Sequence, residues 1–155
     1  MENHRKFLKT LEEYTFGNYF PDSLELKIDG EILITEGISH TEYGSLIFLG
    51  GTNCEACDFD IINEFYQKYS RFNFLMLLYT PSQQHMTHTT KLEIPTKICS
   101  IKNVSKQLNY NGIIPWVFVI NSMGQIIAGG LFNDMETLEA IAWPLIRVHY
   151  LEGVK

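Results

Sequence analysis

Two cysteines three residues apart are the part of this sequence best suited to chemistry. The motif reads Cys54-Glu55-Ala56-Cys57, and the chain has one other cysteine, Cys99. A thiolate is the nucleophile of disulfide exchange, and a nearby second thiol can resolve the mixed disulfide that the first one forms. The spacing is therefore typical of a two-cysteine redox centre.

Two other interpretations of the pair stay open on the sequence. A closed zinc site needs four ligands, and beyond the pair the chain offers Cys99 and five scattered histidines, none of them in the second half of a zinc pattern. The two thiols could also be buried and inert. We expect Cys99 to be a buried structural thiol rather than a third redox centre, because free cysteine is among the most buried residue types.

The elements that must position the motif can be recognised on either side of it. The apolar run Ser45–Leu49 predicts a buried strand, and a helical pattern of apolar residues extends from Cys54 to about Ser70. On this interpretation Cys54 lies in the first turn of a helix, where free N–H groups and the helix dipole stabilise a thiolate. Residues 74–79 form a second buried strand, so the segment predicts a βαβ unit with parallel strands.

Hairpins and helices are predicted around this unit. Leu24–Ile34 alternates apolar and polar residues about Asp29-Gly30, which is a strong hairpin signal. Residues 3–14 carry an apolar stripe at helical spacing, and a short helix capped by Asn103 is expected over 103–111. Residues 80–96 are the least regular part of the chain.

The last third of the chain predicts a strand, a turn, a second strand and a helix. Trp116–Ile120 is a continuous apolar strand, and the turn Asn121–Gly124 leads into its partner. A final helix is expected to open at Asn133, with Glu136 at the spacing of a capping box. Pro144 should kink or end that helix, since proline has no N–H to donate.

Length and composition indicate one domain over residues 1–155, with 1–20 as an N-terminal extension. The formal charge of −6 disfavours nucleic acid and anionic membrane surfaces as partners. The longest apolar run, Ile113–Ile120, is too short to insert into a membrane. With no secretory signal and an odd number of cysteines, a reducing, cytoplasmic location is expected, or an extracytoplasmic one if a leader has been removed.

Taken together, these features resemble the thioredoxin fold over about residues 20–145. More narrowly, the chain is similar to the group that includes the cytochrome-maturation thiol-disulfide proteins and the methylamine-utilisation accessory proteins. The matching pieces are the Leu24–Ile34 hairpin, the strand at Leu46–Leu49, the Cys54–Cys57 motif, and the segments 113–120 and 124–127. The resemblance implies an α/β thioredoxin fold, a central mixed sheet flanked by helices, with an extra N-terminal helix and β-hairpin.

The same resemblance implies roles for the motif. Cys54 is then the attacking thiolate and Cys57 the resolving thiol, while Glu55 and Ala56 form the variable pair. A negative charge at Glu55 should oppose thiolate formation. Asp60 lies where the cytochrome-maturation members place an acid, so it could move protons for Cys57; the alternative is a solvated acid that merely suits the helix dipole.

Pro115 falls where the family keeps a cis-proline that faces the cysteines. The Ile114–Pro115 bond is then expected to be cis, and the backbone of Ile114 to pair with a substrate strand; an ordinary trans proline at the start of a strand is the alternative. Trp116 follows as a further groove residue, bulkier than the usual one. The sequence also departs from the family, with Asn53 in place of an aromatic residue and Phe48 in place of a buried acid.

The expected function is that of a thiol-disulfide oxidoreductase without a cofactor. Its partners would be a protein or peptide with thiols or a disulfide, such as one dedicated secreted peptide, and a recycling redox protein. A non-catalytic binding module that holds a metal or a partner is the alternative. A thiol peroxidase is disfavoured, because Gly50-Gly51-Thr52-Asn53 contains no proline and the nearest arginine in sequence is Arg71. The sequence leaves the redox direction open.

Overall fold

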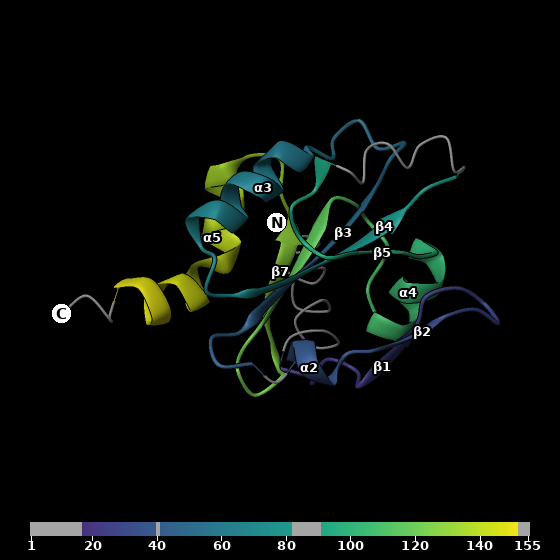
Figure 1. Cartoon of the computed structure of the whole chain (residues 1–155), viewed down its shortest axis with the longest axis horizontal. Helices are drawn as coiled ribbons and strands as arrows, with labels where there is room; N and C mark the ends of the chain where they lie inside the picture. Colours follow the sequence, from purple (N-terminus) through teal and green to yellow (C-terminus); the bar gives the residue numbers. More distant parts are fainter. Residues whose placement is uncertain (1–16, 40, 82–90, 152–155) are drawn as a thin grey trace, which may run out of the picture.

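A five-stranded mixed sheet forms the centre of the molecule (Figure 1). The computed structural model describes residues 17–39, 41–81 and 91–151. The sheet has the order β5-β4-β3-β6-β7, in which β3 pairs parallel with β4 and antiparallel with β6. Its strands are β3 (Ser45–Gly51), β4 (Asn73–Tyr79), β5 (Thr96–Ile98), β6 (Trp116–Ile120) and β7 (Ile126–Leu131).

The inner strands are buried on both faces, which explains why they are continuous apolar runs in the sequence. Every residue of β3 and β6 is buried, as are the five inner residues of β4. The three strands that this pattern predicted are confirmed, and β3 runs on through both glycines to Gly51. The short edge strand β5 was not predicted, because three residues beside Pro95 carry little periodicity.

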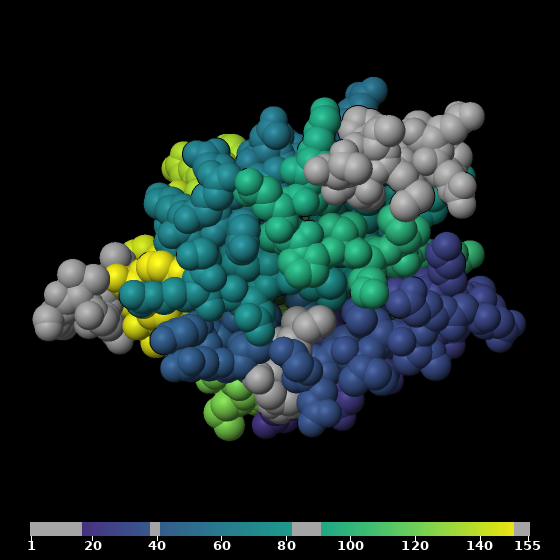
Figure 2. Space-filling model, in the orientation of Figure 1, coloured from purple at the N-terminus to yellow at the C-terminus, as the bar shows by residue number. Residues whose placement is uncertain are grey.

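Helices cover both faces of the sheet, so the predicted architecture is confirmed. One face packs against α3 (Phe59–Lys68) and α5 (Met135–Ile146), and the other packs against α4 (Ile101–Leu108) and an N-terminal hairpin. The hairpin consists of β1 (Ser23–Glu25) and β2 (Ile32–Ile34), and the one-turn helix α2 (Glu36–Ser39) follows it. Figure 2 shows this purple and blue segment at the opposite end of the surface from the yellow end of α5.

The hairpin has the predicted antiparallel pairing but a longer turn than Asp29-Gly30 suggested. The N–H of Leu26 donates to the carbonyl of Glu31 at 2.9 Å, and that of Gly30 donates to Lys27 at 3.0 Å. The left-handed residue is Asp29, with φ 53°. Aspartate tolerates this conformation. The turn is therefore centred one residue earlier than a two-residue loop at Asp29-Gly30 would be.

Two predicted helix starts were wrong by a few residues. Ser100 rather than Asn103 caps α4, and Asp134 rather than Asn133 caps α5. In each case the side-chain oxygen of the cap accepts a hydrogen bond from the backbone N–H of the residue three positions later. Pro144 lies inside α5, which continues to Ile146 and passes into a π-helical segment, Arg147–Leu151, while a kink at Pro144 stays a prediction. The predicted helix over 3–14 lies outside the described residues. Within the described ranges, no helix has the length and apolar character required to span a membrane.

Candidate redox site

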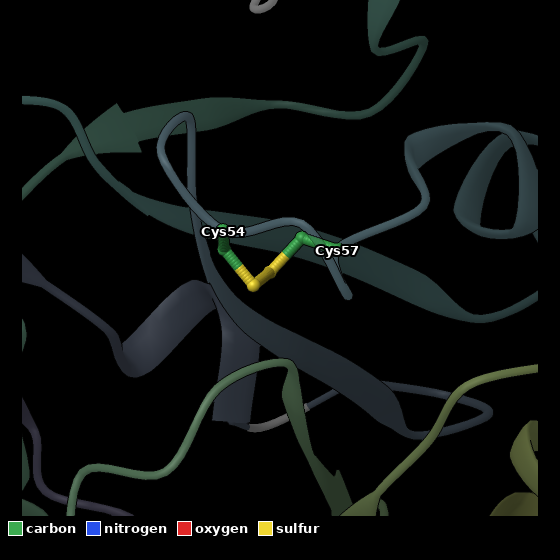
Figure 3. The surroundings of a disulfide bond; sticks show 2 residues. All are labelled: Cys54 and Cys57. Atoms are coloured by element: carbon green, nitrogen blue, oxygen red, sulfur yellow. A yellow bond between two sulfur atoms is a disulfide. The ribbon is translucent and has the colours of Figure 1, made fainter.

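The two cysteines of the motif form a disulfide in the loop between β3 and α3 (Figure 3). Their Cα atoms are 5.3 Å apart. Two successive turns build the loop, since the N–H of Cys54 donates to Gly51 at 3.3 Å and that of Cys57 donates to Cys54 at 3.2 Å. Both cysteines are half-buried, whereas Glu55 and Ala56 are exposed. The disulfide therefore lies at the surface, at the carboxyl end of the central strand.

The predicted position of Cys54 in the first turn of a helix was wrong. The helix α3 begins at Phe59, and Asp58 caps it by accepting from the N–H of Asp60 at 3.0 Å. Aspartate before an apolar periodic run is a strong helix start, and this run begins only at Phe59. The N–H of Cys54 donates within the loop, to the carbonyl of Gly51, and Cys54 lies before the first turn of α3.

Apolar groups lie beside Cys57. A methyl group added at Gly50 would lie 2.8 Å from the Met76 methyl carbon, 3.4 Å from Cys57 Sγ and 3.8 Å from the Phe59 ring. The strand β3 thus passes close to this sulfur at a residue that has no side chain. Phe48, at the place of the buried acid of classical thioredoxins, is fully buried in the core and stacks with Phe74.

The loop before β6 meets the motif at Gly51. A methyl group added there would lie 3.0 Å from Asn53 Oδ1, 3.3 Å from Ile114 Cδ1 and 3.5 Å from the Tyr79 carbonyl oxygen. The Ile114–Pro115 peptide bond is cis, and Pro115 is buried while Ile114 is partly exposed. The structure therefore brings Ile114 next to Asn53, the residue that precedes Cys54.

Trp116 is placed differently from a groove residue. Its side chain is 7% exposed and packs on the rings of Tyr110 and Phe118, within the core on the α4 side of the sheet. The indole N–H has no hydrogen-bond partner among the described residues. The side chain of Trp116 is therefore part of the core, and a place for its backbone in a substrate groove stays a prediction.

Two pockets adjoin the two ends of the motif. One, of about 270 Å³, borders Cys57, and the other, of about 420 Å³, borders Asn53 and Ile114. The first is lined by Glu55, Cys57, Asp58, Phe59, Asp60 and Lys91. The second is lined by Asn53, Tyr79, Ser100, Ile101, Lys102 and Ile114. Asp60 is exposed and lines the same pocket as Cys57. Its role in proton transfer stays a prediction.

Sequence reasoning missed Tyr79, Ile101, Lys102 and Lys91 as neighbours of the site. A signal for Tyr79 was present, because the carboxyl ends of parallel strands meet at one edge of a sheet, and Tyr79 pairs in register with Gly51. The capping pattern at Asp58 was also readable. The other three residues come from segments distant in sequence, for which spacing carries no signal.

Cys99 lies apart from this site, at the end of β5. It is 2% exposed, as expected for a structural thiol, and its N–H donates to the carbonyl of Leu78 at 2.9 Å. Burial, the largest effect on it, raises the pKa of Cys99 to about 12, because an apolar surrounding disfavours the thiolate.

Comparison with known proteins identifies the fold. No family model matches the chain, and no curated protein matches its sequence. A Chlorobium tepidum structure assigned as the thiol:disulfide interchange protein DsbE is 15% identical, with a TM-score of 0.66, over 84% of this chain and 97% of that one. A thiol:disulfide interchange protein from Bacteroides sp. is 14% identical, with a TM-score of 0.62, over 88% and 95%. The thioredoxin domain of a Bacteroides vulgatus thiol-disulfide oxidoreductase is 13% identical, with a TM-score of 0.61, over 82% and 97%. The chain therefore has the thioredoxin fold.

Proposed function

We propose that this thioredoxin-fold protein is a thiol-disulfide oxidoreductase that acts on cysteines of proteins or peptides. The observation that carries the proposal is the half-buried Cys54–Cys57 disulfide at the surface end of β3, adjacent to the Ile114–Pro115 loop. The structural neighbours whose folds match this chain are themselves described as thiol:disulfide interchange proteins or oxidoreductases, which supports the same assignment.

In the proposed reaction, Cys54 of the reduced protein attacks a client disulfide. A bond forms between Cys54 Sγ and one client sulfur, and the other client sulfur leaves as a thiolate. The Cys57 thiolate then attacks Cys54 Sγ, so that the Cys54–Cys57 disulfide forms and the second client thiol is released. Two electrons pass from the protein to the client, and a partner dithiol restores the reduced protein. The reverse sequence oxidises a client dithiol, with a partner disulfide as the electron acceptor.

The surroundings of the two sulfurs favour this division of roles. Cys57 Sγ lies against Gly50, on the side of the strand where Met76 and Phe59 also approach this glycine. Cys54 follows Asn53 on the side of the loop where Ile114 lies. A client strand that pairs with the backbone of Ile114 would bring its own cysteine to Cys54, which is the recognition of an extended peptide by backbone hydrogen bonds.

Single cysteine variants test the proposal. Reduced protein is mixed with a peptide that contains one disulfide, and the products are separated by mass under non-reducing conditions. We expect Cys57→Ser to accumulate a mixed disulfide through Cys54, Cys54→Ser to lose turnover, and Cys99→Ser to behave as the wild type. Reduction of the peptide at the wild-type rate by a Cys54→Ser/Cys57→Ser double variant would contradict the proposal. Failure of the wild type to exchange with glutathione would favour the binding module instead.

A further inference from the structure

Acidic side chains gather on one side of the disulfide. The pocket that borders Cys57 is lined by three carboxylates, from Glu55, Asp58 and Asp60, and by one basic residue, Lys91. The three acids are all exposed. The formal charge of the pocket lining is 1 − 3 = −2, so a client segment that enters it meets a negative potential next to a reactive sulfur.

Two of these carboxylates have no cationic partner within the described part of the chain. The carboxylate of Asp58 accepts a hydrogen bond from the N–H of Asp60, and so it is used in capping α3. The ion pairs among the described residues are Lys68–Glu139 and Lys97–Glu31, neither of which involves the pocket. The charges of Glu55 and Asp60 are therefore available to a bound client.

The opposite end of the motif differs in character. The pocket that borders Asn53 and Ile114 is lined by the apolar side chains of Tyr79, Ile101 and Ile114, with Lys102 as its charged residue and no acid. The negative charge is thus confined to the Cys57 side. A client strand that crosses the disulfide from Ile114 toward Cys57 passes from an apolar surface to an acidic one.

We propose that the redox site selects clients that carry lysine or arginine beside the attacked cysteine, and that Glu55 and Asp60 are specificity-determining residues. The inference rests on the proposed function and names the class of client for that site. An exposed contact between opposite charges changes a rate by about two- to five-fold, so two of them give about four- to twenty-five-fold between a cationic and an anionic client. Salt should reduce this preference, because the Debye length is about 10 Å at 0.1 M ionic strength.

The test uses three disulfide-bonded peptides that differ only in the residue beside each cysteine, which is arginine, glutamine or glutamate. The rate constant for their reduction by the full-length reduced protein is measured at low salt and at high salt. The test variant is Glu55→Gln/Asp60→Asn. The matched control is Glu42→Gln/Glu136→Gln, which removes two exposed acids outside both pockets and gives the same change in net charge. Unfolding midpoints of both variants establish that each one is folded.

We expect the arginine peptide to react about four- to twenty-five-fold faster than the glutamate peptide at low salt, with a smaller ratio at high salt. The ratio should fall to near one in the test variant and stay unchanged in the control. Equal rates for all three peptides would overturn the inference while the proposed function stands. An equal loss of preference in both variants would also overturn it, because net charge rather than the pocket would then select the client. If even the glutamine peptide is not reduced, the proposed function itself fails.

Discussion

Cys99 is expected to react with an alkylating reagent about a thousand-fold more slowly in the folded protein than in the unfolded chain. The thiolate is the reactive form, and a pKa of about 12 in place of the ordinary 9.0 lowers its fraction at pH 8 by about three powers of ten. Its 2% exposure slows the reagent further. The physical cause is burial, which removes the water that stabilises the charged thiolate.

The assay uses the oxidised protein, in which the Cys54–Cys57 disulfide leaves Cys99 as the free thiol. Alkylation is followed by mass at pH 8, in buffer and in denaturant. The reduced protein, in which Cys54 is also a free thiol, is alkylated in parallel for comparison. The same burial makes stability depend on pH. Because the thiol ionises more readily in the unfolded chain, its contribution to stability is complete below about pH 9 and is lost as the pH rises toward 12. Alkylation of folded protein within about ten-fold of the unfolded rate would refute the reasoning.

Two further predictions concern the fold that supports the site. Gly44→Ala should lower the free energy of unfolding by about 2–4 kcal/mol in a denaturant titration, because φ at Gly44 is +99° and the new methyl group would lie 2.7 Å from the Ile120 carbonyl oxygen. The control is Gly37→Ala, whose new methyl group would have nothing within 4 Å. An equal effect of the two substitutions would contradict the steric argument. Glu139→Gln should weaken the dependence of stability on acid pH, since hydrogen bonds from Tyr69 and Lys68 lower the pKa of Glu139 in the folded protein. The stability that Glu139 contributes is present above the unfolded pKa of about 4.3 and is lost as the pH falls through the lower folded pKa. Unfolding curves at pH 7 and pH 3 measure this difference, and an identical pH dependence for the variant and the wild type would be the contrary result.

The sheet was predictable because its inner strands have no polar face. Strands β3, β4 and β6 are covered on both faces, so they are uninterrupted apolar runs in the sequence. Such runs can be recognised as buried strands without knowing which strands pair with them. The cysteine motif was equally readable, since its residue types and spacing are local. The cis bond before Pro115 was expected through the family resemblance, because nothing in its local sequence distinguishes it from a trans proline.

The rest of the site depends on contacts between distant segments. Ile101 reaches the pocket beside Asn53 because α4 packs under the sheet, and Lys91 reaches the pocket beside Cys57 from a segment that precedes β5. No spacing rule connects these positions to the motif. Trp116 shows the same limit in a different way, because strand alternation does not decide which of two apolar-covered faces a residue occupies. Its place in the core on the α4 side follows from packing with Tyr110 and Phe118.

The late start of α3 changes the electrostatic surroundings that the sequence predicted at the cysteines. A helix that opened at Cys54 would place positive backbone N–H groups at the sulfur and stabilise the thiolate. In the structure that N–H is bonded to Gly51, and the residues that follow the motif add the carboxylates of Asp58 and Asp60 to that of Glu55. The disulfide carries no charge, so these acids act on the reduced state and not on the oxidised one. The same carboxylates that would attract a cationic client are therefore the negative charges that a thiolate of the pair would face.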